Sequence, residues 1–122
     1  MKPDIDFALL ARMNLPRRSA AEAETVFREG DAADQMFIVH SGRVAIEHNG
    51  KVLDELGPGD PFGEMALVDG TPRSATARCT QPCELLVLNE KSFLFLVDEM
   101  PYFALKMMRI MAHRLRAMNE RV

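Results

Sequence analysis

The segment from residue 62 to residue 76 holds the residues with the clearest capacity for chemistry. It runs Phe-Gly-Glu-Met-Ala-Leu-Val-Asp-Gly-Thr-Pro-Arg-Ser-Ala-Thr. Gly63 lets the backbone approach a ligand closely, and the short helical turn expected after it exposes free N–H groups that suit an anion. Arg73 follows a turn fixed by Pro72, where its guanidinium can hold two oxygens of a phosphate diester. The segment therefore predicts an anion site.

Glu64 requires a different partner, because a carboxylate beside a bound anion is repulsive unless it accepts a hydroxyl proton. A ribose 2′-hydroxyl meets this need, since it lies a sugar-width from the phosphate. The alternative is that Glu64 and Arg73 form a surface ion pair, which contributes about 0 to 1 kcal/mol.

The segment resembles the phosphate-binding cassette of the cyclic-nucleotide-binding domain family, which includes regulatory subunits of cAMP-dependent kinase, the catabolite activator protein and cyclic-nucleotide-gated channels. The resemblance rests on Phe-Gly-Glu-Met-Ala-Leu, a short spacer and Pro-Arg-Ser-Ala-Thr. It continues through residues 28–31, 37–42 and 43–46, which are similar to the opening hairpins of that family. It covers nearly the whole chain.

The resemblance implies that Gly63 and Glu64 hold the ribose hydroxyl and that Arg73 pairs with the cyclic phosphate. It also implies that Ser74 and Ala75 offer backbone N–H groups to the phosphate, and that the helix after Pro101 is a lid over the base. The expected ligand-binding residues are Phe62, Gly63, Glu64, Met65, Ala66, Arg73, Ser74, Ala75 and Arg114.

The residue at position 74 bears on the base of the nucleotide. In the family, threonine at the position of Ser74 tends to accompany cGMP and alanine tends to accompany cAMP, whereas serine is ambiguous. We expect cAMP, with weaker binding of cGMP. Arg114 has two interpretations: its guanidinium plane stacks on the purine, or it is a snorkelling surface arginine.

Glycine spacing organises the rest of the chain, since every glycine lies between Gly30 and Gly70. Asn49-Gly50 predicts a tight hairpin turn. Short strands at this spacing favour an antiparallel β-roll, jelly-roll-like, in an α+β protein. The expected strands are residues 24–27, 35–40, 43–48, 51–56, 73–79 and 84–89.

The two ends of the chain favour helices. Apolar spacing predicts a helix over residues 4–14 within an N-terminal helical segment of residues 1–20, and Arg17-Arg18 is interpreted as a solvated loop. The β-roll then covers residues 21–89 and the C-terminal helices residues 90–122, all within one domain. Asn89 is the expected N-cap of a helix over residues 90–99, and Pro101 opens the next helix. The expected apolar face of that last helix is Phe103, Met107, Ile110, Met111, Arg114, Leu115 and Met118.

Composition narrows the function classes. The net charge of -3 argues against duplex nucleic acid or an anionic membrane as the main partner. Cys79 and Cys83 lack zinc-site spacing and are interpreted as reduced core or strand residues, and the three histidines are scattered. The cassette lacks the metal-binding carboxylates or histidines that a phosphodiesterase needs. Ser74 has no histidine or lysine base at a recognisable spacing to make it a nucleophile.

These observations predict a non-catalytic, cytoplasmic sensor without a metal, a cofactor or a membrane segment. Its partners would be a cyclic nucleotide and an unidentified output protein or domain. The output surface is formed by the lid and N-terminal helices if the chain is complete, and a channel or enzyme lies elsewhere if it is a fragment. The alternative is a degenerate domain that binds no nucleotide and acts as a protein-interaction module.

Overall fold

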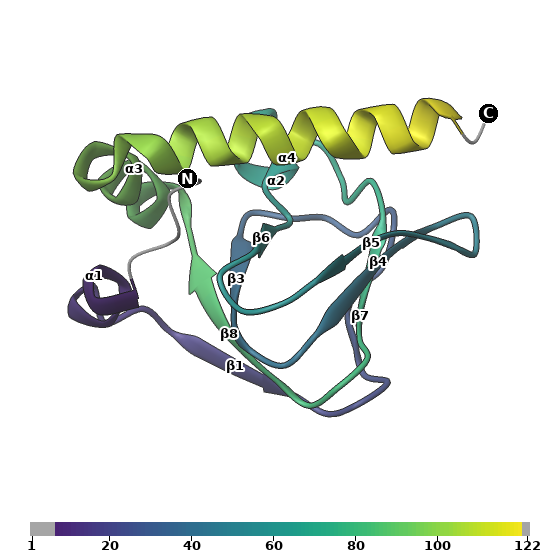
Figure 1. Cartoon of the computed structure of the whole chain (residues 1–122), viewed down its shortest axis with the longest axis horizontal. Helices are drawn as coiled ribbons and strands as arrows, with labels where there is room; N and C mark the ends of the chain where they lie inside the picture. The colour runs from purple at the N-terminus through teal and green to yellow at the C-terminus, as the bar shows by residue number, and fades with distance from the viewer. Residues whose placement is uncertain (1–6, 121–122) are drawn as a thin grey trace.

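A computed structural model describes residues 7–120 of the chain, where two four-stranded antiparallel sheets form a roll (Figure 1). In spatial order, the first sheet contains β1 (Arg17–Ala20), β8 (Cys83–Leu88), β3 (Met36–Ser41) and β6 (Pro61–Phe62). The second contains β2 (Thr25–Phe27), β7 (Thr76–Cys79), β4 (Val44–His48) and β5 (Lys51–Leu56). The helices are α1 (Phe7–Arg12), α2 (Met65–Val68), α3 (Glu90–Glu99) and α4 (Pro101–Glu120). The predicted α+β roll is confirmed.

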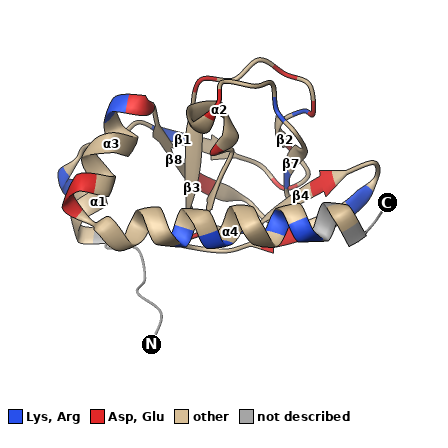
Figure 2. Cartoon of the chain, turned by 90° about the horizontal axis from the view of Figure 1, so that it is seen from above, with Lys and Arg blue, Asp and Glu red and all other residues tan. Residues whose placement is uncertain are grey.

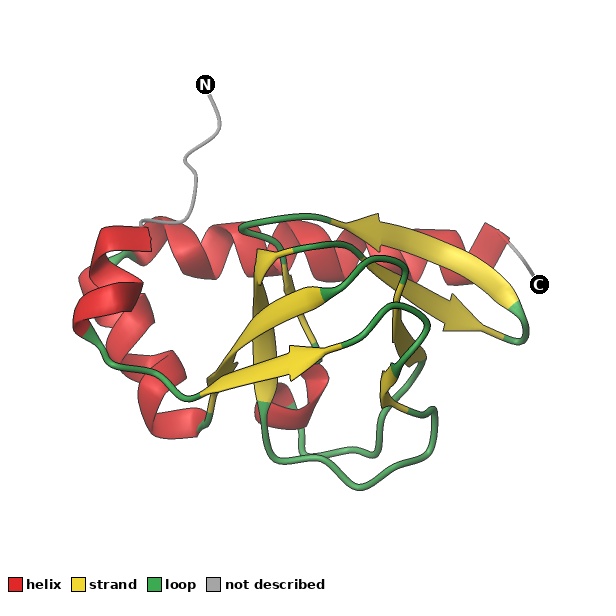
Figure 3. Ribbon diagram, turned by 90° about the horizontal axis from the view of Figure 1, so that it is seen from below, coloured by secondary structure: helices red, strands yellow, loops and turns green. Residues whose placement is uncertain are grey.

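The first sheet is buried on both faces. Successive side chains of a strand point to opposite faces, so on β3 Phe37 and Val39 enter the core between the sheets, whereas Met36 and Ile38 pack against the helices. Figure 3 shows α1 and α3 gathered at one end of the roll and α4 along one side. The helices thus cover the outer face of a sheet whose inner face is already filled.

The second sheet carries the predicted hairpin. β5 has the bounds expected from the sequence, and it pairs with β4 across the Asn49-Gly50 turn. The two turn residues have φ values of 52° and 74°. Positive φ at both central positions is the requirement of a tight type I′ turn, which Asn and Gly tolerate.

The N-terminal boundary is a correction. The expected helical segment was to extend to residue 20, with Arg17-Arg18 in a loop, but these residues lie in β1 and pair with β8. β1 is an edge strand, where charged side chains are common because one side faces solvent. The roll therefore begins at Arg17 and not at residue 21. Residues 4–6 of the expected helix lie outside the described part of the chain.

The strand that follows the cassette is also shorter than expected. It was predicted from Arg73, but β7 begins at Thr76. The backbone of Arg73 is bonded instead to the loop before β3: its N–H donates to the carbonyl oxygen of Asp31 and its carbonyl accepts the N–H of Gly30, both at 2.8 Å. These bonds hold Arg73 outside the sheet ladder, next to the cassette.

The C-terminal helices begin as predicted. The Asn89 side chain accepts the backbone N–H of Ser92 at 2.9 Å and caps α3, and Pro101 opens α4. On α4, Phe103 and Met107 are buried, whereas Leu115 is 61% exposed. The prediction that Leu115 belongs to the covered face is wrong: Phe103 and Met107 pack against side chains of β3, β8 and α3, whereas Leu115 faces solvent. The Met118 side chain lies outside the described part.

The cysteines are small core residues, as predicted: Cys79 and Cys83 are both free and buried. Burial, together with the Cys83 side chain, raises the pKa of the Cys79 thiol to about 12. Within residues 7–120, no group of histidine, cysteine, aspartate or glutamate side chains is arranged to hold a metal ion. No helix in that range has the length and apolar character that crossing a membrane requires.

Candidate functional site

The cassette, the second sheet and α4 enclose a hollow on one side of the roll. Eight of the nine predicted ligand-binding residues line it, together with three residues from β2, β4 and β5. The lining consists of Phe27, Ile46, Leu53, Gly63, Glu64, Met65, Ala66, Arg73, Ser74, Ala75 and Arg114. The cassette and α4 therefore meet at one place, although Arg114 is far from the cassette in sequence.

Arg73 is buried with its guanidinium fixed by the backbone. It is 9% exposed. Its Nη1 donates to the carbonyl of Gly63 and its Nη2 to that of Gln35, each at 2.8 Å. The guanidinium carbon lies 4.0 Å above the centre of the Phe27 ring, a cation–π contact.

The remaining nitrogen of Arg73, Nε, is buried. Its N–H donates to no acceptor among the described residues. Burial lowers the pKa of this guanidinium, and the carboxylates of Asp34, Glu64 and Asp31 act in the opposite direction. Buried polar groups are usually hydrogen-bonded and buried charges are usually paired. An anion in the hollow would satisfy both requirements at Arg73.

Gly63 makes this arrangement of Arg73 possible. Its φ is +76°, and a Cβ atom built on it would lie 2.7 Å from Nη1 of Arg73. Any other residue would suffer both a strained backbone and a collision with the guanidinium. The glycine therefore admits the arginine side chain, in addition to the close ligand approach expected from the sequence.

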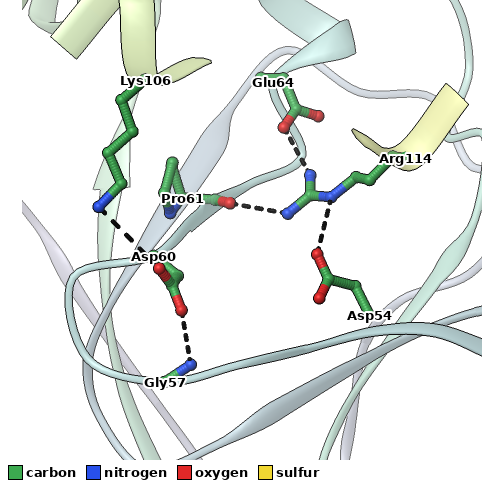
Figure 4. A network of polar contacts seen from close by, with 7 residues as sticks. All are labelled: Asp54, Gly57, Asp60, Pro61, Glu64, Lys106 and Arg114. Atoms are coloured by element: carbon green, nitrogen blue, oxygen red, sulfur yellow. Dashed lines mark hydrogen bonds and ion pairs between the residues drawn. The ribbon is translucent and has the colours of Figure 1, made fainter. Parts of the chain in front are cut away.

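Glu64 is held by a residue of α4. It is 5% exposed, and its Oε1 accepts a hydrogen bond from Nη1 of Arg114 at 2.6 Å. Arg114 Nη2 also donates to the carbonyl of Pro61 at 3.0 Å, and its Nε lies 3.7 Å from Oδ2 of Asp54 (Figure 4). Arg114 thus joins α4 to three segments of the roll.

Two alternatives from the sequence are wrong. Glu64 and Arg73 do not form a surface ion pair, because both are buried, and Glu64 pairs with Arg114 while Arg73 bonds to carbonyls. Arg114 is not a snorkelling surface residue, since its side chain is 12% exposed and ion-paired on both sides. The side of α4 that carries Arg114 therefore contacts the roll.

Phe62 is the predicted site residue that does not line the hollow. It is fully buried, and its ring lies 5.3 Å from Phe37 and 5.9 Å from Phe27, between centroids. It supports Phe27, which in turn lies under Arg73. Sequence reasoning missed Phe27, Ile46 and Leu53, because an apolar residue on a strand that lines a hollow has the same pattern as one in the core.

The site offers two kinds of recognition. A buried guanidinium with a free N–H suits a phosphate oxygen by a charge-assisted bond, and a buried carboxylate suits a hydroxyl donor. Apolar side chains of Phe27, Ile46 and Leu53 supply the remaining wall. This combination fits a small ligand that has an anionic group, a hydroxyl and an apolar ring.

Comparison with known proteins identifies the family. The family model for the cyclic nucleotide-binding domain matches residues 17–100. The chain belongs to this family. The cyclic AMP receptor protein of Thermus thermophilus is 36% identical over 112 residues, a match covering 88% of this chain and 52% of that protein.

Solved structures share the fold. The structure of cAMP-bound PfPKA-R superimposes with a TM-score of 0.77 at 30% identity, covering 87% of this chain and 36% of that one. A structure from work on a cyclic-GMP-dependent signalling pathway in bacterial phytopathogenesis gives a TM-score of 0.71 at 30% identity, covering 87% of this chain and 91% of that one. The chain spans about half the length of the cyclic AMP receptor protein, and family members bind cAMP or cGMP as a ligand.

Proposed function

We propose that this chain binds cAMP in the hollow beside the cassette and acts as a non-catalytic sensor. The observation that carries the proposal is the buried guanidinium of Arg73, whose Nε has no hydrogen-bond partner within residues 7–120. It lines the same hollow as the buried carboxylate of Glu64. A cyclic phosphate and a ribose hydroxyl on one ligand match this pair.

Different residues of the site contact different parts of the ligand. Arg73 binds the cyclic phosphate, and the backbone N–H groups of Ser74 and Ala75 face the same oxygens. Glu64 accepts the ribose 2′-hydroxyl beside Gly63. Met65 and Ala66, at the start of α2, complete the wall on the ribose side. Phe62 contributes by supporting the ring under Arg73.

Binding without turnover follows from the chemistry of the lining. Glu64 is the carboxylate among the lining residues, and Arg114 occupies one of its oxygens. In the proposed complex the two guanidiniums stabilise the anion, and the second oxygen of the Glu64 carboxylate accepts the ribose hydroxyl, so this carboxylate is not available to activate water. A cytoplasmic location remains a prediction, as does the treatment of residues 1–122 as one domain.

The preference for cAMP over cGMP depends on Ser74, which is exposed and lines the hollow. A serine hydroxyl lacks the methyl group of threonine, so its orientation toward a guanine amine is less restricted. We expect cAMP to bind more tightly. The relatives include structures associated with each nucleotide, so competition decides the question.

The output would be carried by α4, which runs along one side of the roll (Figure 1) and contributes Arg114 to the lining of the hollow. A nucleotide that contacts both the cassette and α4 favours the lid-closed population over the open one. An output protein or a further domain would respond to that change.

Equilibrium dialysis of nucleotide-free protein with labelled cAMP tests the function. Saturable uptake displaced by unlabelled cAMP, more weakly by cGMP and least by 5′-AMP, is the expected result. Absence of uptake by folded protein would refute nucleotide binding and favour the alternative of a protein-interaction module. Displacement by cGMP at lower concentration than cAMP would reverse the choice of base.

A further inference from the structure

Arg114 makes the contact that joins the lid helix to the ribose end of the hollow. Its two terminal nitrogens donate to Glu64 and to the carbonyl of Pro61. A second link lies two turns earlier on α4, where Lys106 Nζ donates to the carbonyl of Gly59 at 3.3 Å and lies 4.0 Å from Asp60 Oδ1 (Figure 4). Figure 2 shows that α4 carries several basic residues, and Arg114 is bonded to the cassette.

The contact with Glu64 has an electrostatic consequence. A buried carboxylate without a cationic partner is strongly unfavourable, and a nucleotide would bring a second negative charge into the same hollow. Arg73 faces this hollow too, but its terminal nitrogens are engaged by carbonyls. Arg114 is therefore the cation hydrogen-bonded to Glu64 in the described part of the chain.

The geometry leaves Glu64 able to bind ligand. Arg114 engages Oε1, so Oε2 remains to accept a hydroxyl. The guanidinium is also fixed by Pro61 and lies near Asp54, which limits its freedom to turn toward a base. Its contacts point to Glu64 as the group through which it acts.

We propose that Arg114 is a positioning residue: it holds the Glu64 carboxylate in place for the ribose hydroxyl and thereby couples nucleotide binding to the position of α4. This inference rests on the proposed function and replaces the interpretation that Arg114 stacks on the purine. The lid helix then contacts Oε1 of Glu64 through Arg114, and the nucleotide contacts Oε2 through its ribose hydroxyl.

A double-mutant cycle on cAMP affinity tests the inference, because it separates action through Glu64 from direct contact with the nucleotide. The variants are Arg114→Ala, Glu64→Gln and the double variant, each measured by calorimetric titration. We expect Arg114→Ala to weaken binding about tenfold, within the range found for directly interacting pairs. In the Glu64→Gln background the same change should weaken binding less than about threefold.

Two outcomes overturn the inference. Equal losses in the two backgrounds would mean that Arg114 acts on the nucleotide itself, and unchanged affinity in Arg114→Ala would mean that it has no role in binding. Arg114→Lys should recover part of the affinity, since a lysine can pair with Glu64 but cannot also bond Pro61 in the same geometry. If Arg114→Ala does not fold, the same cycle is completed with Arg114→Lys.

Arg116→Ala is the matched control, because Arg116 is exposed on the same helix and the substitution removes the same charge. It should bind cAMP as the unaltered chain does. Hydrogen exchange gives a second readout: cAMP should protect residues 101–116 in the control but much less in Arg114→Ala. Failure of the unaltered chain to bind cAMP would refute the proposed function; binding with uncoupled losses would refute this inference alone.

Discussion

Replacing Arg73 by alanine is the most informative perturbation of the phosphate site. The substitution removes a buried guanidinium that bonds to Gly63 and Gln35 and whose Nε–H has no hydrogen-bond acceptor among the described residues. A phosphate bound there would lose its charged partner while remaining shielded from water. Loss of one member of such a pair weakens binding by about 2 to 4 kcal/mol, or about 30- to 900-fold.

The assay is calorimetric titration with cAMP at constant ionic strength. Arg73→Lys should give an intermediate affinity, because lysine keeps the charge but lacks the fork that bonds two carbonyls together. Arg28→Ala is the control for net charge, since Arg28 is exposed on the loop before β3, and it should bind normally. Thermal unfolding of each variant separates lost affinity from lost fold.

The refuting result is equally specific. Unchanged cAMP affinity in a folded Arg73→Ala variant would show that the phosphate binds elsewhere. An equal loss of cAMP affinity in Arg28→Ala would show that the effect comes from the overall electrostatic field of the protein and not from a direct contact with the phosphate. Either result would remove the basis of the site assignment.

Three further outcomes follow from the same structure. Gly63→Ala should lower both stability and cAMP affinity, stability by about 1 to 3 kcal/mol from backbone strain, because its Cβ would meet Arg73; chemical denaturation and titration measure the two effects, and normal values for both would contradict the role of Gly63. The Cys79 thiol, whose pKa burial raises to about 12, should react slowly with an aromatic disulfide reagent at pH 8 until the chain is unfolded. Its contribution to stability is complete below its unfolded pKa of about 8.5 and declines as the pH rises above that, so Cys79→Ala should show a smaller alkaline decline. Saturating cAMP should slow amide exchange in α4 after Pro101, and identical exchange with and without ligand would refute the lid proposal.

The cassette could be predicted from sequence because its chemistry is local. Gly63, Glu64 and Arg73 lie within eleven residues, so spacing and residue type were enough to indicate an anion beside a hydroxyl. The Asn49-Gly50 turn and the Asn89 cap were predictable for the same reason, since each is decided by neighbouring residues.

Features set by distant parts of the chain could not be predicted. β1 has two arginines and one buried residue, so its pairing with β8 leaves no clear alternation in the sequence. β6 has only two residues, too few for a period. The partner of Arg114 depends on where α4 crosses the roll, which helical spacing does not fix. Phe27 likewise has the pattern of an ordinary core residue until Arg73 is placed above it.

The Nε–H group of Arg73 offers the most direct test of the account. Its nitrogen resonance can be followed by two-dimensional NMR during titration of nucleotide-free protein with cAMP, with Arg73→Lys identifying the signal. Because this buried donor lacks a partner among the described residues, the account predicts a saturable shift as it bonds to a phosphate oxygen. An unmoved signal in folded protein at saturating cAMP would contradict the claim that Arg73 binds the cyclic phosphate.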